Sequence, residues 1–144
     1  MTIATIDACI LCTLRINRRT KLFSGNKATL NFYLSNFTDV SSLVNAVQNI
    51  AYLGGNTNTT GGLRLARTEI FNAANGDRLD IPNVIILITD GIPTREVDEL
   101  PAEVRRIKNI GDRIVGVGVT NAVSECDTIV FSCIYRREPN VNLD

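Results

Sequence analysis

VIILITDG, residues 84–91, is the stretch that decides the fold class of this chain. Its first five residues, Val84 to Ile88, are all apolar, and four of them are β-branched. This run predicts a strand that is buried on both faces, which is typical of a central parallel strand with helices above and below it. The strand is expected to stop at Thr89-Asp90-Gly91, because Asp and Gly favour turns.

The residues on both sides of this stretch alternate between helical and strand periodicity. Apolar residues at helical spacing predict helices over residues 43–50, 63–74 and 96–109. Residues 28–34 alternate between apolar and polar and predict a half-buried strand, whereas residues 114–119 predict a second buried strand. The order of these elements predicts an α/β fold with a doubly wound, mainly parallel sheet and helices on both faces.

The composition excludes several classes of function. Lys+Arg and Asp+Glu both number 15, so no basic excess indicates binding to nucleic acid. The chain contains no histidine, which removes the usual general base and the Ser-His-Asp triad. No apolar run approaches the roughly 20 residues of a membrane-spanning helix. Residues 1–14 are mildly apolar but lack a basic start, so they do not form a convincing signal peptide.

The four cysteines do not follow the spacing of a zinc site. Cys9 and Cys12 form a C-x-x-C pair, but Cys126 and Cys133 are separated by six residues. A zinc site requires two closely spaced pairs, and a redox C-x-x-C usually opens a helix after a strand. We therefore expect buried thiols or disulfides, with the pairing left open.

Two oxygen-rich features are expected at one edge of the sheet. Asp90 follows the buried strand, and the loop around Thr57, Thr59 and Thr60 follows the first clear helix. In an open parallel sheet, ligands bind beyond the carboxyl ends of the strands. Carboxylate and hydroxyl oxygens suit Mg²⁺, Mn²⁺ or Ca²⁺. The alternative interpretation is that Asp90 only opens the turn before Gly91.

Three motifs together resemble the von Willebrand factor type A (VWA) domain family. Residues 50–63 are similar to its GG-x-T-x-T-G loop, residues 84–91 to its central strand ending in TDG, and residues 113–119 to the following I-x-x-x-G-V-G strand. Leu22-Phe23-Ser24 with residues 28–34 resembles an F-S strand end and an antiparallel edge strand. The motifs occur in family order and spacing across residues 22–123, with closest similarity to collagen VI and matrilins. The resemblance implies a Rossmann-like fold.

The resemblance also implies a metal-ion-dependent adhesion site at the sheet edge. Thr57 and Asp90 match its threonine and aspartate ligands, which would hold Mg²⁺ or Mn²⁺. The residues implied to contact a partner protein are Asn56, Asn58, Thr59 and Gly91. The family's D-x-S-x-S ligand loop is absent, because the only early acid, Asp7, is followed by residues that include no serine at the required places. We therefore expect weak or absent metal assistance.

The chain departs from the family pattern at both ends. Residues 1–21 are expected to be irregular or non-homologous, residues 22–123 to form a partial VWA domain, and residues 124–144 to form a tail. The charged side chains of Arg18, Arg19 and Lys21 argue against residues 1–21 filling the place of the missing first strand. We therefore expect a truncated domain, which is a fragment, a splice form or the product of a faulty gene model.

The predicted function is that of a protein-binding adhesion module, with an extracellular matrix or cell-surface protein as partner. The alternative is a metal-free structural or interaction fragment of a multidomain matrix protein. A metal-dependent hydrolase is disfavoured, because the chain has no histidine and no second carboxylate cluster, so we expect no enzyme. Secretion is implied by the resemblance, and Asn36 then begins a glycosylation sequon. A second sequon at Asn58 is not expected to be used, since a glycan there would block the partner.

Overall fold

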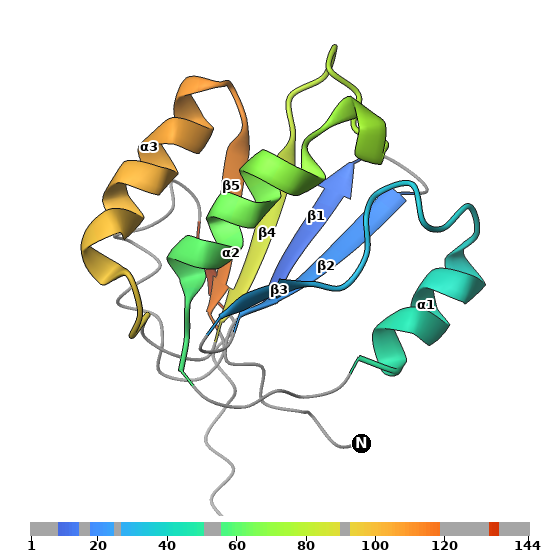
Figure 1. The fold of residues 1–144 in the computed structure, drawn as a ribbon, viewed down its shortest axis with the longest axis horizontal. Helices are drawn as coiled ribbons and strands as arrows, with labels where there is room; N and C mark the ends of the chain where they lie inside the picture. Colours follow the sequence, from blue (N-terminus) through green and yellow to red (C-terminus); the bar gives the residue numbers. More distant parts are fainter. Residues whose placement is uncertain are drawn as a thin grey trace, which may run out of the picture.

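The computed structural model describes the backbone of residues 9–14, 18–24, 27–50, 56–89, 93–118 and 133–135, and the side chains of residues 27–50, 56–89 and 93–117. A six-stranded sheet with the strand order β3-β2-β1-β4-β5-β6 forms its centre (Figure 1). The strands are β1 (Cys9–Leu14), β2 (Arg18–Ser24), β3 (Ala28–Leu30), β4 (Val84–Thr89), β5 (Arg113–Gly118) and β6 (Cys133–Tyr135). Among the described residues, no helix has the length and apolar character that crossing a membrane requires.

The structure describes six helical segments between and beside the strands. They are α1 (Val40–Gln48), α2 (Thr59–Leu65), η1 (Ala66–Ile70), η2 (Ala73–Asn75), η3 (Val97–Glu99) and α3 (Leu100–Asn109). Asp39 caps α1, because its carboxylate accepts a hydrogen bond of 2.8 Å from the Ser42 N–H. Gly76 in the left-handed conformation ends η2, close to residue 74, where the predicted helix ends.

The strand pairing confirms the α/β fold class but makes the sheet mixed instead of mainly parallel. Strands β4, β5 and β6 pair in parallel, whereas β1 is antiparallel to both β4 and β2, and β2 is antiparallel to β3. Only residues 15–17 connect β1 to β2. A connection this short allows only an antiparallel hairpin, because a parallel crossover needs a dozen residues or more.

This hairpin corrects the expectation of an irregular segment over residues 1–21. Strand β1, which pairs with β2 on its other side, occupies the place beside β4 where a first strand was expected to be missing. Without them, the backbone groups along one edge of β4 would lack hydrogen-bond partners, which is unfavourable in the middle of a sheet. Because Cys9 lies opposite Ile88, β1 begins at the edge of the sheet where β4 ends.

Two further elements differ from the periodicity of the sequence. Strand β3 covers only Ala28–Leu30 of the predicted strand over residues 28–34, although Phe32 and Leu34 are still buried. The alternation in this stretch therefore reflects burial beyond the end of the strand. Helix α1 covers Val40–Gln48, so it begins and ends slightly earlier than the helix predicted over residues 43–50. Strand β6 (Cys133–Tyr135) lies within residues 124–144, which were expected to form a tail.

The hydrophobic core lies between the sheet and the helices α2 and α3, which cover the same face (Figure 1). On β4, Ile85 and Leu87 are buried, whereas Val84, Ile86 and Ile88 are half-buried. The face of β4 that packs on the helices is therefore fully buried, and the other face is only partly buried. The apolar run had predicted helices on both faces. The core comprises Leu34, Leu63, Ala66, Ile70, Ile85, Leu87, Leu100, Val104, Ile107 and Ile114.

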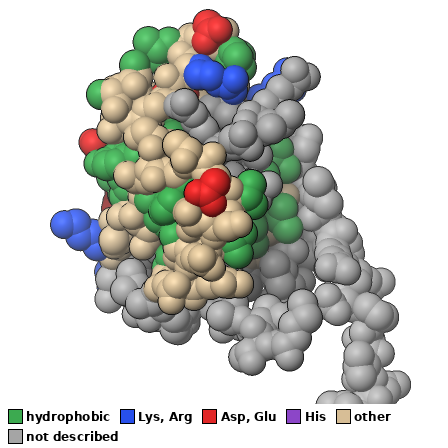
Figure 2. Space-filling view, turned by 90° about the vertical axis from the view of Figure 1, so that its right-hand side faces the viewer, with side chains coloured by type: hydrophobic (Ala, Val, Ile, Leu, Met, Phe, Trp, Pro, Cys, Tyr) green, Lys and Arg blue, Asp and Glu red, His purple; other side chains and the backbone are tan. Residues whose placement is uncertain are grey.

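Helix α1 lies at the β3 edge of the sheet instead of over its face (Figure 1). Leu43 is its only buried residue, and Val44, which the helical spacing placed inward, is 42% exposed. The molecular surface on this side carries apolar side chains and few charged ones (Figure 2). The helical periodicity thus predicted the helix correctly but overestimated how much of it is buried.

A buried carboxylate joins α3 to η1, the helical segment that directly follows α2. Glu103 of α3 has no exposed surface, and its two oxygens accept hydrogen bonds from Arg67 Nε (2.6 Å) and Arg106 Nη1 (2.9 Å). Burial acts to raise the pKa of Glu103, but the hydrogen bonds from Arg67 and Arg106 outweigh it and hold the pKa below its ordinary value. Glu103 therefore stays charged and fixes η1 against α3.

The first prediction concerns this carboxylate. Glu103→Gln removes the negative charge while it keeps the size of the side chain, and it leaves the guanidinium of Arg67 without its counter-charge. We expect the free energy of unfolding to fall by about 2 kcal/mol, measured by urea denaturation at pH 7. The matched control is Glu99→Gln, because Glu99 pairs with Arg64 at the surface. An equal loss in both variants would contradict the prediction.

The second prediction is the pH dependence of the same interaction. Because the pKa of Glu103 is lowered in the folded chain, its stabilisation is fully present above the unfolded value of roughly 4.3 and is lost as the pH falls through the lower folded value. The stability difference between the wild type and Glu103→Gln should therefore be constant from pH 7 to 5 and shrink toward pH 3. Urea midpoints at each pH measure it, and a difference that grows on acidification would refute this origin.

Candidate functional site

The candidate site lies at the edge of the sheet where β4 ends and α2 begins, at the bottom of Figure 1. Thr57 joins two loops there through its backbone. Its N–H donates to Thr94 Oγ1 (3.1 Å), and its carbonyl accepts from the N–H groups of Thr94 (2.9 Å) and Arg95 (3.2 Å). The threonine-rich loop and the segment that follows β4 are therefore held together at this edge.

Asn58 locks the beginning of α2. Its side chain is 4% exposed, and its Oδ1 accepts a hydrogen bond of 2.7 Å from the Gly61 N–H. A Cβ atom at Gly61 would lie 2.9 Å from this oxygen, so the close approach requires glycine. The N-cap at Asn58 also explains why α2 already begins at Thr59, within the residues predicted to form a loop.

Glu96 receives hydrogen bonds from three residues of this loop and helix. Its carboxylate accepts from Asn58 Nδ2 (2.9 Å) and from Arg64 Nη1 (2.7 Å), and its carbonyl accepts from Thr60 Oγ1 (2.9 Å). The hydrogen bond from Asn58, followed by that from Arg64, lowers the pKa of Glu96. These contacts hold a residue with a φ of 49°, which is unfavourable for a side chain other than glycine.

Sequence reasoning missed Glu96 for a physical reason. Its partner Asn58 is 38 residues away along the chain, and no local pattern pairs the two side chains. Glu96 resembled an ordinary charged residue at the beginning of a predicted helix. Only the packing of α2 beside the segment after β4 shows that it organises the site.

The structure places the predicted site residues in two groups. Thr57 lies at the predicted edge and is 7% exposed, and Asn56 beside it is half-buried. Asn58 and Thr59 are 4% and 1% exposed, so they support the loop from inside in this structure. The predicted residues Asp90 and Gly91 lie outside the described residues. Convergence of Thr57 and Asp90 on one ion therefore stays a prediction.

The described donors do not complete a metal site of the implied kind. Within the part of the chain that the structure describes, His, Cys, Asp and Glu side chains form no group of three or more that could hold a metal. Glu96 is already bound by Asn58 and Arg64. The D-x-S-x-S ligands are absent from the sequence, which leaves Thr57 as the only described ligand candidate at this edge.

The two glycosylation sequons differ in accessibility. Asn58 is buried and bonded on both its oxygen and its nitrogen, and the absence of a glycan there stays a prediction. Asn36 is exposed in the turn after β3, and its Oδ1 accepts a hydrogen bond from the Tyr33 N–H. Glycosylation of Asn36 stays a prediction.

The third prediction tests the role of Asn58. Asn58→Ala removes the cap of α2 and the hydrogen bond to Glu96 together, so we expect the free energy of unfolding to fall by about 2 kcal/mol. Urea denaturation measures the loss. Asp39→Ala is the control, because it removes an exposed cap from α1, and its effect should be smaller. Equal effects would show that the bond to Glu96 does not contribute.

The sequence of this chain is similar to a known domain family and to several known proteins. The sequence model of the von Willebrand factor type A domain matches residues 14–133, a range wider at both ends than residues 22–123. Cochlin from Bos taurus is 36% identical over 70 residues, which is 49% of this chain and 13% of cochlin. Matrilin-1 from Gallus gallus is 34% identical over 94 residues, which is 65% of this chain and 18% of matrilin-1.

Solved structures support the same relationship at the level of the fold. The mussel byssus proximal thread matrix protein 1 has a TM-score of 0.74 at 20% identity, over 81% of this chain and 31% of that protein. A second structure of that protein, with a TM-score of 0.73, is described as having a zinc-occupied MIDAS motif. This chain thus spans less than a fifth of the length of the two named curated relatives. Because the family's sequence model matches residues 14–133 of the 144, the chain belongs to the von Willebrand factor type A domain family.

Proposed function

We propose that this chain is a protein-binding module of the adhesion type, and that its contact surface is the sheet edge formed by residues 56–60 and 93–96. The observation that carries the proposal is the set of hydrogen bonds by which the Thr57 backbone is joined to Thr94 and Arg95. They preorganise two loops at the edge where ligands bind in open α/β sheets. The partner is an extracellular matrix or cell-surface protein.

The edge residues differ in burial, and we assign them two roles: contact with the partner protein and support of the loop. Asn56, Thr94 and Arg95 have exposed or half-exposed surface, so they are suited to contact the partner together with Gly91. Asn58 and Thr59 act from inside by holding the loop in shape. A rigid loop loses little conformational freedom on binding, which favours affinity without a large contact area.

Metal assistance in this module is weak. Thr57 and Asp90 are the proposed ligands of Mg²⁺ or Mn²⁺, and when bound the ion would offer an open position to a carboxylate of the partner. One carboxylate and one hydroxyl hold a divalent ion poorly, so the protein contacts of the edge provide most of the affinity. The zinc-occupied MIDAS motif of the mussel protein supports a metal at this place in the fold, although that chain is only 20% identical.

Two other functions are less well supported. A metal-free structural unit would use the same edge without Asp90, and the network of Asn58, Glu96 and Arg64 favours it because no ion is needed to shape the loop. A hydrolase would need a base to activate water, and the chain contains no histidine. An extracellular location is supported by relatives that include matrilin-1 and collagen α-1(XII).

Calorimetric titration of the chain with MgCl₂ and MnCl₂ gives the fourth prediction. We expect weak binding, with a dissociation constant on the order of 1 mM or above, that disappears in Asp90→Ala and in Thr57→Ala. Heat that persists in both variants would place the ion elsewhere. The absence of heat in the wild type would support the metal-free module instead.

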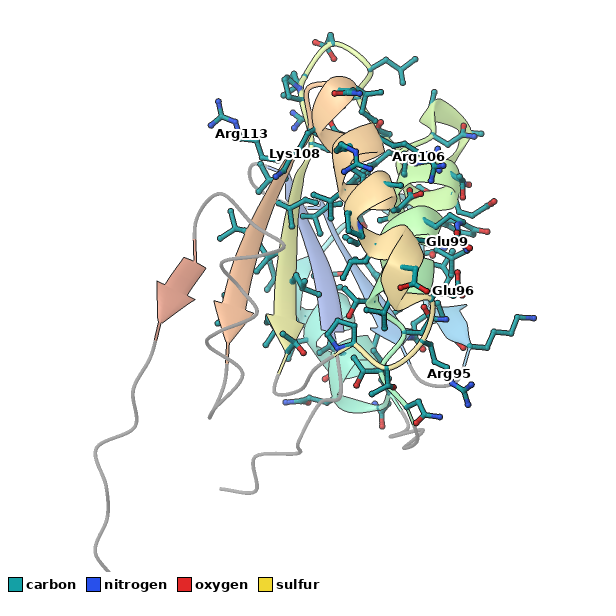
Figure 3. All side chains as sticks on the ribbon, turned by 90° about the vertical axis from the view of Figure 1, so that its left-hand side faces the viewer. Arg95, Glu96, Glu99, Arg106, Lys108 and Arg113 are labelled. Atoms are coloured by element: carbon teal, nitrogen blue, oxygen red, sulfur yellow. The ribbon has the colours of Figure 1, made fainter. Side chains whose placement is uncertain are left out.

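The binding surface itself is tested with two matched charge removals. Arg95 and Arg113 are both exposed but lie at opposite ends of the sheet (Figure 3). Arg95→Ala should weaken binding to a sensor coated with reconstituted extracellular matrix at least threefold, whereas Arg113→Ala should leave it unchanged. Chelation of divalent ions with EDTA should have a smaller effect than Arg95→Ala. Equal effects of the two substitutions would refute the proposed edge.

A further inference from the structure

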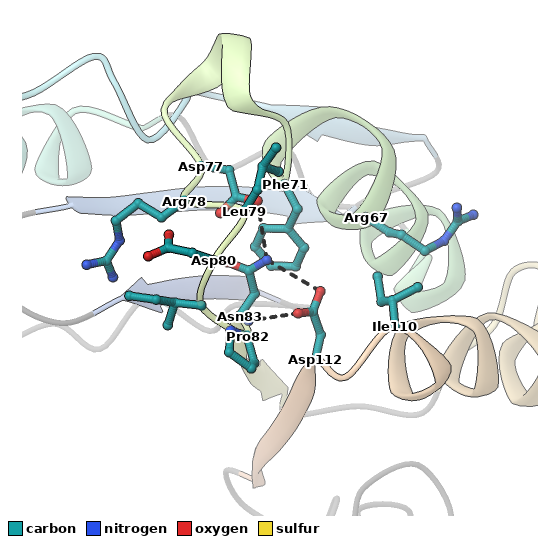
Figure 4. Close-up of a pocket in the computed structure, with 11 residues that line it drawn as sticks. Arg67, Phe71, Asp77, Arg78, Leu79, Asp80, Pro82, Asn83, Ile110 and Asp112 are labelled. Carbon is teal, nitrogen blue, oxygen red and sulfur yellow. Dashed lines mark hydrogen bonds between the residues drawn. The ribbon is translucent and has the colours of Figure 1, made fainter.

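The end of the sheet opposite the adhesion edge carries a hollow that the adhesion function does not use. It has a volume of about 380 Å³ and lies between the connection from η2 to β4 and the beginning of β5 (Figure 4). Pockets that bind ligands usually have volumes of roughly 300–1,000 Å³. The hollow is therefore large enough to take one bulky side chain of a partner protein.

Exposed apolar side chains gather at the rim of this hollow. Leu79 is 78% exposed, Ile110 is 60% exposed and Ile81 is 40% exposed. They are three of the six large apolar side chains that lie exposed in the described part of the chain, and all three line this one hollow. Phe71 and Pro82 line it as well. Such a concentration of exposed apolar surface is typical of a site where another molecule binds.

Two buried oxygens in the hollow have no hydrogen-bond donor among the described residues. They are Asp77 Oδ1 and Asn83 Oδ1, and Asn83 as a whole is only 6% exposed. Both nitrogen atoms of Asn83 are already engaged, because its backbone N–H donates to Asp112 Oδ1 (2.7 Å) and its Nδ2 lies 3.5 Å from Asp77 Oδ2 and from Asp112 Oδ2. The amide nitrogen thus faces two carboxylates, which keeps the amide oxygen on the other side. A buried acceptor without a donor is unfavourable, so a ligand that brings a donor gains free energy there.

The charges around the hollow favour a donor that is neutral. Asp77, Asp80 and Asp112 line the hollow and disfavour an anionic group. Arg67 and Arg78 also line it and disfavour a cation. A neutral N–H group avoids both kinds of repulsion, and its hydrogen bond to a carboxylate is stronger than one between two neutral groups.

We propose that the hollow binds the indole ring of a tryptophan that projects from a partner protein. The indole N–H is a donor only, so it satisfies Asp77 Oδ1 or Asn83 Oδ1 and brings no acceptor toward the carboxylates. The ring packs on the apolar rim around Leu79 and Ile110, and its face attracts a guanidinium such as that of Arg78. Tryptophan is also enriched among the side chains that carry most of the binding free energy at protein interfaces. These 144 residues contain no tryptophan, so a second copy of them cannot be the occupant.

Binding of the ring requires a side-chain movement at the rim. Both oxygens are covered in the unbound chain, so the indole N–H reaches them only after a neighbouring side chain is displaced. Leu79 and Ile110 each have more than half of their surface exposed and are therefore packed against few neighbours. Changes of side-chain rotamer are common when proteins bind, and they leave the fold unchanged.

Fluorescence titration of the full chain tests the proposal, with N-acetyltryptophanamide as the probe. The chain contains no tryptophan, so selectively excited indole emission comes from the probe alone. We expect a saturable blue shift of this emission, with a dissociation constant on the order of 1 mM. The analogue that carries a methyl group on the indole nitrogen should bind at least tenfold more weakly, because it has no N–H to donate. The absence of a saturable shift, or equal affinity of the two probes, would overturn the proposal.

Two pairs of matched variants locate the bound probe. Asp77→Leu removes a buried acceptor and should reduce the affinity at least threefold, whereas Asp80→Leu, at an exposed position on the same rim, should not. Leu79→Ser should reduce the affinity at least threefold, whereas Val40→Ser, which shortens an exposed apolar side chain on α1, should not. Because Leu79 is exposed, Leu79→Ser decides the matter if Asp77→Leu does not fold. Equal effects within each pair would refute this location.

The same titration separates this hollow from the adhesion edge. Arg95→Ala and Asp90→Ala change only the edge, so they should leave the affinity for the probe unchanged. The probe should shift the amide NMR signals of Asn83 and not those of Thr94. Loss of probe binding in Arg95→Ala, or shifts at Thr94 in place of Asn83, would show that the indole binds at the edge and would overturn the second surface.

Discussion

The backbone of β4 must be hydrogen-bonded along both of its edges, and the arrangement of the whole domain follows from this constraint. Strand β5 satisfies one edge in parallel, as expected for neighbours joined through a helix. Strand β1 satisfies the other edge in antiparallel orientation. The sheet thus stays continuous although the residues before β2 lack the features of a VWA first strand.

The direction of β1 has a consequence for the functional edge. Because β1 begins beside the end of β4, its own end at Leu14 lies toward the opposite end of the sheet. The D-x-S-x-S ligand pattern is also absent from the sequence. The edge is instead organised by hydrogen bonds between the Thr57 loop and the segment after β4.

The two ends of the sheet differ in how their polar atoms are satisfied. At the adhesion edge, Glu96 accepts hydrogen bonds from Asn58, Thr60 and Arg64, so its charge is balanced within the protein. At the other end, Asp77 and Asn83 retain buried oxygens without donors. The residues that match the family's ligand pattern lie at the first end, whereas the described oxygens without donors lie at the second.

The sequence by itself determined the local elements, because these depend on near neighbours. The apolar run Val84–Ile88 predicted β4, and the helical spacing over residues 43–50 predicted the helix that the structure describes as α1. Only the tertiary structure decided the direction of β1 and the pairings of Asn58 with Glu96 and of Asn83 with Asp112. A strand's direction depends on which edge is open to it, and these side-chain pairs are 38 and 29 residues apart, beyond the reach of any local periodicity.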